Sequence, residues 1–439
     1  MNTITKLSFV VGASVLVACG PSTPAPKTGA DLAKEKAAKE SGEASIQAMM
    51  PPKAKREVSG AAAQDFATAV KRYREARQRG LSKGDCASVA EAFGSIYAGN
   101  TKLVEAKFNE GAVWHECGDL AKAEQIYQGI LNQHAGYGPA LNNLGQIYLG
   151  RGSEPQALSY FEKAAGQKNS EGYANLALVQ RNRALQGDSG SLKDGVNNIH
   201  RSLAVDSHNI EAYATLALLL YDHAKSPAQL EMARLICLQA ARVDPKYSPI
   251  YNILGLVLLK SGRVTPALVE FRRAVSIDPN FKEALMNIGA VTLSFRDYKS
   301  AEQAFAKVLS LSPAKSTQIA ATIGLGVALR GQRKFADAMA RYQEVQKLDP
   351  SNLDISYNMG LIVQDYTFDA SNPAKGIAAL QQAEGHFNRY IAGGQNQGKV
   401  EDARRRIKNI NEMIPMLREQ EKMGAQPAAE PAKAKAGAK

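Results

Sequence analysis

The chain is poor in the residues that carry most enzyme chemistry. Its 439 residues include six histidines, four cysteines and one tryptophan. The histidines are dispersed, and no serine or cysteine stands in a nucleophile motif. His115-Glu116-Cys117 suggests a metal site that no second cluster completes, and Gly324-x-Gly326 lacks the strand that a dinucleotide site requires. The sequence therefore predicts a protein that is not an enzyme and has no metal or cofactor.

The chain does have a clear internal period of 34 residues. Residue types that recur at this spacing are Gly255 and Gly289, Ala267 and Ala301, Phe271 and Phe305, and Pro279 and Pro313. Agreement of this kind, with each position keeping its own chemistry, indicates stacked two-helix repeats. Such arrays offer a long curved surface and seldom carry chemistry of their own. We therefore expect the protein to hold other molecules rather than to transform them.

The clearest copy reads Tyr251-x2-Leu254-Gly255-x2-Leu258, followed by Ala267-x3-Phe271-x2-Ala274-x4-Pro279. Spacings of three and four put these residues on one face of each helix. Gly255 and Ala267 are small where two backbones must approach, and Phe271 fills the space between them. The pattern resembles the tetratricopeptide repeat. That resemblance implies an all-α fold, a right-handed α-solenoid of stacked helix-turn-helix repeats.

Eight copies align on this pattern between residues 104 and 390. Their expected starts lie near Val104, Gly138, Ser170, Ile210, Ser248, Lys282, Ile319 and Leu353. The third, fourth and eighth copies have extra residues between their helices, and the seventh has three in front. A degenerate helix pair is expected at 61–103, and a charged capping helix at 391–423, because the open end of a solenoid needs a polar cover.

The N-terminal segment 1–18 has the features of an export signal. Lys6 precedes an apolar run, Leu7 to Val17, that is too short to span a bilayer. The run ends at Leu16-Val17-Ala18-Cys19, which resembles the bacterial lipoprotein signal. The resemblance implies cleavage before Cys19, acylation of that residue with chains such as palmitate, and export. Gly20 after the cysteine favours the outer membrane, facing the periplasm; an ordinary secretory signal is the alternative.

The segments that flank the repeats differ from them in composition. Residues 19–60 form a tether without the aromatic residues that a core needs, and residues 424–439 are an Ala/Lys/Pro tail, so both are expected to be disordered. The net charge is +12 and the isoelectric point about 9.3. An exported protein has little access to nucleic acid, so we expect attraction to an anionic membrane, an envelope polymer or an acidic partner. A solvated helix face is the alternative.

The cysteines have separate interpretations. Cys19 is the expected lipid anchor. Cys237 takes the place of Phe271 in its repeat, which predicts a buried apolar side chain. Cys86 lies near the start of one predicted helix and Cys117 near the end of the next, so antiparallel packing brings them close. An oxidising compartment then permits a disulfide. Two free thiols are the alternative, because the register of the degenerate helix pair is not fixed by the sequence.

In tetratricopeptide proteins, ligands usually lie on a concave wall formed by the first helix of each repeat. The resemblance places a partner-binding groove at Asn142, Tyr221, Asn252, Leu256, Leu259, Met286 and Tyr357. Its apolar middle indicates a contact surface, unless superhelical winding or the last helix covers it. Four further asparagines recur at one repeat position and are interpreted as structural: Asn143, Asn175, Asn287 and Asn358.

Together these features predict an outer-membrane-anchored periplasmic scaffold that docks other proteins of an envelope machine. In overall layout the chain resembles the tetratricopeptide lipoprotein of the adventurous gliding-motility machinery. Two alternatives remain: a type IV pilus secretin pilotin or outer-membrane assembly factor, and a peptidoglycan-associated accessory of a wall enzyme. The expected partners are envelope proteins, the membrane through acyl chains and, in the last case, peptidoglycan.

Overall fold

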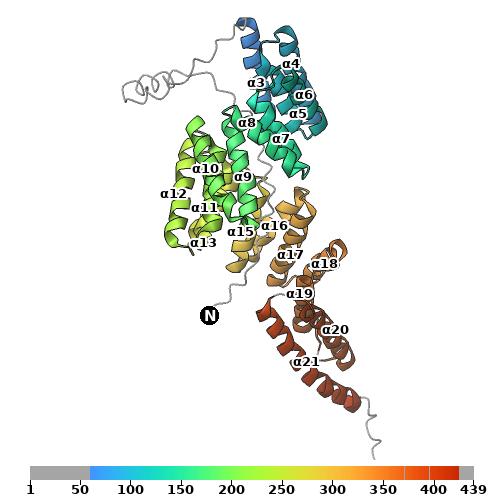
Figure 1. Ribbon diagram of the computed structural model, residues 1–439. Coiled ribbons are helices and arrows are strands. Elements are labelled where there is room, and N and C mark those ends of the chain that lie inside the picture. Colours follow the sequence, from blue (N-terminus) through green and yellow to red (C-terminus); the bar gives the residue numbers. More distant parts are fainter. Residues whose placement is uncertain (1–59, 370, 395, 425–439) are drawn as a thin grey trace, which may run out of the picture. The chain divides into compact units, whose positions relative to one another are not determined.

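The computed structural model describes residues 60–369, 371–394 and 396–424. Every regular element in these ranges is a helix (Figure 1), which confirms the all-α class expected from the repeats. The signal segment, Cys19 with its tether and the C-terminal tail lie outside the described residues. The chain divides into two compact units between Lys225 and Ser226, and each unit is described by itself.

The first unit contains the degenerate pair and the copies up to the first helix of the fourth. Its helices are α3 (Gly60–Arg79), α4 (Lys83–Gly99), α5 (Val104–Glu116), α6 (Leu120–Gln133), α7 (Gly138–Gly150), α8 (Glu154–Gly166), α9 (Ser170–Leu185), α10 (Ser189–Val205) and α11 (Ile210–His223).

The second unit contains the remaining copies and the final helix. Its helices are α12 (Pro227–Val243), α13 (Ser248–Lys260), α14 (Val264–Ile277), α15 (Lys282–Ser294), α16 (Tyr298–Ser310), α17 (Lys315–Gly331), α18 (Phe335–Leu348), α19 (Asp354–Ile362), the π-helical turn η1 (Val363–Thr367), α20 (Pro373–Ile391) and α21 (Gln397–Gly424).

A glycine facing an aromatic ring forms the centre of each well-formed repeat. Phe161 and Phe271 are fully buried. A Cβ atom added at Gly145 would lie 2.5 Å from the ring of Phe161, and one at Gly255 would lie 2.5 Å from the ring of Phe271. The glycine is therefore required because the ring occupies the space of a side chain. These contacts bring the two helices of one repeat together.

The extra residues of the irregular copies lengthen helices more than they lengthen loops. In the third copy, α9 and α10 have 16 and 17 residues and leave only Gln186–Asp188 between them. The predicted start of the seventh copy at Ile319 is wrong: α17 begins at Lys315, because no helix-breaking residue separates the two positions. In the eighth copy, some of the extra residues lie in the η1 turn, because a π-helical turn accommodates an insertion within a helix.

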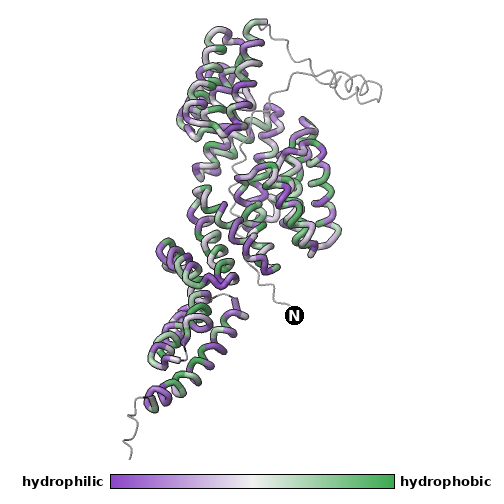
Figure 2. The backbone as a smooth tube through the Cα atoms, turned by 180° about the vertical axis from the view of Figure 1, so that it is seen from behind, coloured by the Kyte–Doolittle hydropathy of each residue, from purple (hydrophilic) through white to green (hydrophobic). Residues whose placement is uncertain are grey.

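Hydrophobic and hydrophilic positions alternate around the helices of both units (Figure 2), which is the pattern of amphipathic helices packed on one face. None of the helices in the described part of the chain is both long enough and apolar enough to cross a membrane.

Candidate functional site

The apolar surface with the best support lies on the first helices of the second unit. We define the α13–α15 wall as Leu256 and Leu259 on α13 with Met286 and Leu293 on α15. All four side chains are half-buried. Met286 and Leu293 pack against the buried cluster of Leu285 and Phe305, so the wall is a partly solvated layer over a firm core.

Asn252 and Asn287 join the two helices of this wall. The Asn287 side-chain amide donates a hydrogen bond to Asn252 Oδ1 at 2.8 Å. A buried amide without a partner costs about 1 to 3 kcal/mol, so this bond holds α13 and α15 in register. The wall residues Leu256 and Leu259 follow Asn252 by one and two turns on the same helix. They therefore lie on the same face of α13 as Asn252.

Two of the asparagines expected to contact a partner are structural instead. Asn142 and Asn252 are only 3% and 8% exposed. Asn175 donates to Asn142 Oδ1 at 2.8 Å, in the same manner as Asn287 donates to Asn252. The prediction of Asn142 and Asn252 as contact residues is wrong, because their amides bind the next repeat. Asn287 and Asn175 have the structural role that the sequence predicts.

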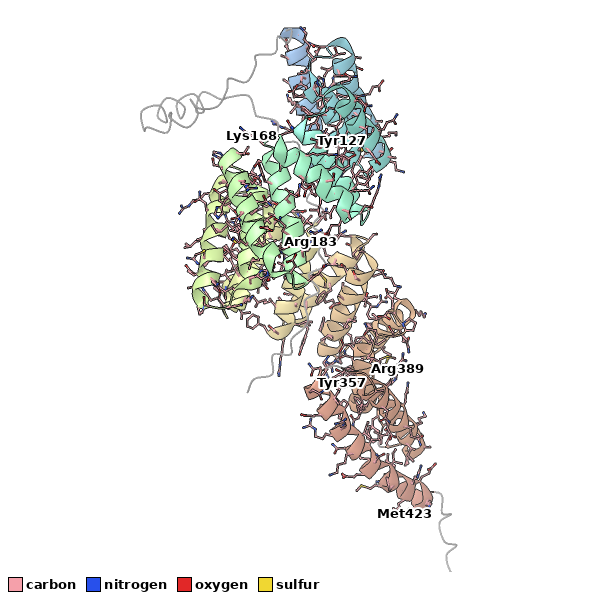
Figure 3. The ribbon with its side chains drawn as sticks, in the orientation of Figure 1. Tyr127, Lys168, Arg183, Tyr357, Arg389 and Met423 are labelled. Carbon is pink, nitrogen blue, oxygen red and sulfur yellow. A yellow bond between two sulfur atoms is a disulfide. The ribbon has the colours of Figure 1, made fainter. Side chains whose placement is uncertain are left out.

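Tyr357, labelled in Figure 3, lies on α19 and contacts other helices of the same unit. Its hydroxyl donates a hydrogen bond to Asp402 of α21 at 2.7 Å. Its ring lies 5.3 Å from the ring of Tyr390 and 6.0 Å from that of Phe387. Burial, together with the bond to Asp402, raises the pKa of this hydroxyl. The prediction of an open contact residue at Tyr357 is corrected: here the last helix covers the wall.

Tyr221 lies in the first unit, next to a buried ion pair. Arg181 on α9 donates from Nε to the carboxylate of Asp222 on α11, and their side chains are only 4% and 9% exposed. Burial, with the negative charge of Asp222, raises the pKa of the half-buried Tyr221 hydroxyl. The repeat pattern did not predict this pair, because Arg181 and Asp222 stand at repeat positions without a fixed residue type.

Cys86 on α4 and Cys117 at the C-terminal end of α5 are joined in a disulfide with a Cα–Cα distance of 6.2 Å. Beside it, Glu116 accepts hydrogen bonds from the Tyr73 hydroxyl and, at 2.8 Å, from Arg77 Nε. Glu116 thus ties α3 to α5. Among the described residues, no group of three or more His, Cys, Asp or Glu is placed to hold a metal ion.

The remaining cysteine, Cys237, is a free and fully buried thiol on α12. Burial raises its pKa to about 12. The thiolate is the reactive form of cysteine, so this residue is unreactive near neutral pH. Its place in the core agrees with the apolar role that the sequence predicts for it.

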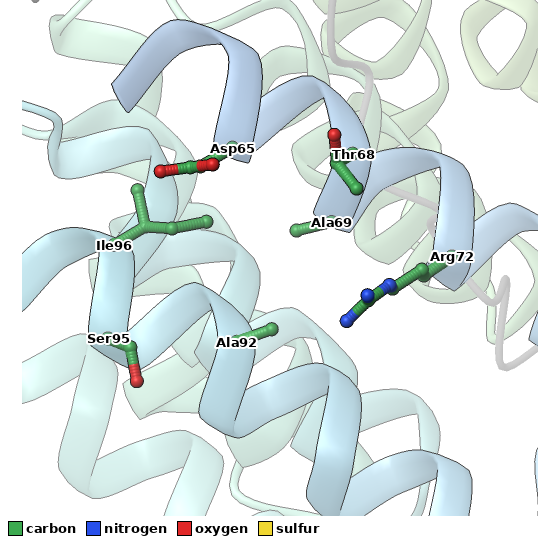
Figure 4. A pocket seen from close by; sticks show the side chains of 7 residues that line it. All are labelled: Asp65, Thr68, Ala69, Arg72, Ala92, Ser95 and Ile96. Atoms are coloured by element: carbon green, nitrogen blue, oxygen red, sulfur yellow. The ribbon is translucent and has the colours of Figure 1, made fainter. Parts of the chain in front are cut away.

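A pocket of about 340 Å³ lies between α3 and α4 (Figure 4). Its lining residues are Asp65, Thr68, Ala69, Arg72, Ala92, Ser95 and Ile96. Figure 4 shows Asp65 and Arg72 reaching toward it from α3. The pocket combines small residues with isolated charges and brings no nucleophile next to a base, so it offers no arrangement for group transfer.

Comparison with known proteins agrees with this geometry. The sequence profile of the family Tetratricopeptide repeat matches residues 248–281. A solved structure described as an IFIT1 monomeric mutant aligns with a TM-score of 0.54 at 16% identity, covering 86% of this chain and 88% of that one. The chain therefore contains the tetratricopeptide repeat. The matched segment is the copy that contains Gly255 and Phe271.

Curated relatives share only part of their length with this chain. Human protein O-mannosyl-transferase TMTC1 is 27% identical over 47% of this chain and 23% of its own. Bovine BBSome complex member BBS4 is 21% identical over 56% of this chain and 44% of its own. The chain thus spans less than half the length of these relatives. Tetratricopeptide repeats indicate a scaffold for protein–protein interaction, and the fold and the α13–α15 wall agree with that general role.

Proposed function

We propose that this protein is a non-enzymatic scaffold of the bacterial envelope, which docks other proteins of a multiprotein machine on its first helices. The observation that carries the proposal is the α13–α15 wall. Leucine and methionine side chains that remain half-solvated on an otherwise well-packed array favour a contact surface. Methionine also suits an adaptable contact with a partner helix or extended segment.

The test is a double substitution, Leu256→Asp with Leu259→Asp. Two carboxylates on the wall should abolish cross-linking to envelope partners while helicity and melting temperature stay near those of the unchanged protein. The matched control is Gln303→Asp with Ala340→Asp, which adds the same charge to exposed positions of second helices. Retained cross-linking in the wall variant would refute the site, and unfolding would show that the wall is core.

We further propose that the protein is exported and held in the outer membrane through acyl chains on Cys19, facing the periplasm. Two observations support export: the lipoprotein-like signal, and the disulfide between Cys86 and Cys117, because disulfides persist in oxidising compartments. Cys19→Ala should leave unprocessed precursor. Mature protein in the membrane fraction of that variant would overturn the assignment.

The machine that we propose is gliding motility, with a pilotin or outer-membrane assembly role and a wall-associated role as the alternatives. Sedimentation with purified peptidoglycan sacculi distinguishes the last of these. A scaffold for proteins should remain in the supernatant, whereas a wall-associated accessory should sediment with the polymer. The phenotype of a gene deletion then distinguishes the other two roles. Loss of gliding supports the gliding-motility role, whereas loss of pilus assembly or of outer-membrane protein insertion supports the pilotin or assembly role.

A further inference from the structure

Large apolar side chains are exposed on the second helices of two consecutive repeats. Met232 and Leu235 on α12 are 54% and 53% exposed, and Val269 on α14 is 58% exposed. Leu235 and Val269 stand 34 residues apart and therefore occupy the same repeat position. We refer to these three residues as the outward aliphatic patch. The outward aliphatic patch lies in the second unit, on other helices than those of the α13–α15 wall.

The other repeats show that this position normally carries a polar or small residue. It is the second residue after the buried small residue of the second helix, and it is exposed in all eight copies. Its occupants along the chain are Gln125, Ser159, Asn197, Leu235, Val269, Gln303, Ala340 and Ala378. Only α12 and α14 place a branched aliphatic side chain there. Repeat geometry alone therefore does not explain Leu235 and Val269.

The two helices lie side by side. The negative charge of Glu270 on α14 acts on the Cys237 thiol of α12, and the positive charge of Arg263, which precedes α14, acts on Glu231 of α12. Because Leu235 and Val269 occupy the same repeat position, they lie on the same face of their two helices. The patch is thus a surface of two helices rather than three isolated side chains.

Basic side chains precede α14 and lie on it. Arg263 and Arg272 are exposed, and within the part of the chain that the structure describes neither forms a direct ion pair with a carboxylate. Arg273 is also exposed, and its guanidinium lies over the ring of Tyr251 at 4.1 Å. Among the acids near these arginines, Glu231 is paired with Arg234 at 2.6 Å, and Asp297 lies near enough to Arg272 for that charge to help lower its pKa. Glu270 buries one carboxylate oxygen without a hydrogen-bond partner, and burial raises its pKa.

We propose that the outward face of α12 and α14 rests on the anionic lipid surface of a membrane. Methionine, leucine and valine enter the boundary between headgroups and acyl chains, and the arginines bind lipid phosphates. This combination of aliphatic side chains with a basic rim is the chemistry of interfacial helices. The inference does not depend on the wall or its partner.

A membrane fits the patch better than a protein partner does. Protein interfaces concentrate binding energy in buried aromatic residues and need about 800 Å² from each partner. The outward aliphatic patch contains no aromatic residue and only three exposed apolar side chains. A lipid surface needs no matching shape. A weak contact with it becomes effective when a second attachment already keeps the protein near the bilayer.

The test measures how close single residue positions lie to the acyl chains of the lipid. Tryptophan is placed in the full chain by Leu235→Trp, Val269→Trp or Gln303→Trp, and the signal of the native Trp114 is subtracted. Each variant is mixed with phosphatidylglycerol vesicles whose acyl chains carry bromine, a short-range quencher. We expect about twofold quenching at positions 235 and 269. Position 303 should show almost none, because an interfacial helix enters the bilayer by only about 5 to 10 Å, so only residues on the inserted face come close to the acyl chains.

Position 303 is the matched control, because it is the same exposed repeat position on α16. A membrane anchor elsewhere in the chain would leave all three positions alike. Equal quenching at the three positions, or none at any, therefore overturns the proposal. Brominated phosphatidylcholine vesicles should quench positions 235 and 269 much less, and Arg263→Gln with Arg272→Gln should reproduce that loss on anionic vesicles. Undiminished quenching in both experiments would refute the role of charge.

Discussion

Each well-formed repeat depends on a pair of residues with complementary volumes, one small and one large. Gly255 leaves the space that the ring of Phe271 fills, and the same exchange recurs between Gly145 and Phe161. These partners lie within one repeat, only 16 residues apart in both cases. A local match of this kind is visible in a single sequence, because both members recur at the same spacing.

At this scale we predict opposite effects for two glycine-to-alanine substitutions. Gly255→Ala should destabilise the protein by about 1 to 3 kcal/mol, because its Cβ would overlap the fully buried Phe271. Gly385→Ala should stabilise by about 0.5 to 1 kcal/mol, because this helical glycine has no atom within 4 Å of the added Cβ. Urea unfolding followed by circular dichroism measures both. Equal effects of the two would contradict the packing argument.

Elements are joined by contacts that the repeat pattern does not contain. Helix starts such as Ser248 and Lys282 match the expected ones, since the same turn chemistry recurs in each copy. The contacts of Tyr357 and Asn252 were missed for a different reason. Helical spacing tells which face a residue lies on, but the neighbouring helix determines whether that face meets solvent. For Tyr357 that neighbour is α21, whose pattern is unrelated to the repeat.

The attachment of α21 should depend on pH through Asp402. Burial raises the pKa of this carboxyl, but hydrogen bonds from Tyr357 and Arg406 outweigh burial and leave the pKa lowered. The ionised form therefore stabilises the fold above the pKa of the unfolded chain, and this stability is lost as the pH falls through the folded value. Melting temperatures between pH 7 and about pH 3 measure the effect.

Tyr357→Phe keeps the ring and removes the hydrogen bond to Asp402. We expect a loss of about 1.5 kcal/mol at pH 7, as for a hydrogen bond to a charged group. The pKa of Asp402 should rise toward its unfolded value in this variant, so less stability should be lost on acidification and the loss should be complete at a higher pH. Phe387→Leu is a control that alters ring packing without removing the hydroxyl. Identical pH profiles for the Tyr357→Phe and unchanged proteins would contradict the role of Asp402.

A second prediction at the scale of elements concerns the disulfide. Cys86→Ser with Cys117→Ser should lower stability by about 3 to 4 kcal/mol, because the bond closes a loop of 31 residues in the unfolded chain. Hydrogen exchange of α3 to α5 should increase most, since the covalent link between α4 and α5 is lost and only noncovalent contacts then hold these helices together. A reducing agent should reproduce this in the unchanged protein and have no further effect on the double variant.

On the scale of the whole chain, each of the two compact units contains fully buried aromatic side chains. Phe161 is fully buried in the first unit and Phe271 in the second. In stacked arrays each repeat contacts its neighbours, so stability is close to a sum of local terms. Composition and period predict this organisation well. They do not predict where the array divides, because that depends on helix contacts around the insertion that precedes Ser226.

We therefore expect damage to remain within the unit that receives it. Phe161→Ala and Phe271→Ala should each cost about 3 to 5 kcal/mol through the cavity that they leave. Hydrogen exchange measured by mass spectrometry should increase over residues 60–225 for the first variant and over residues 226–424 for the second. A uniform increase across the chain in either variant would show that the two units unfold as one.

The buried thiol of Cys237 also has a practical consequence. Because the thiolate is the form that reacts with maleimide dyes, a raised pKa and full burial protect this residue from labelling in the folded protein. The disulfide removes two further cysteines from the reaction. With Cys19 replaced, one cysteine introduced at Gln125 and another at Gln303 would accept a donor and an acceptor dye. Energy transfer between them would then report the distance between the units in single molecules.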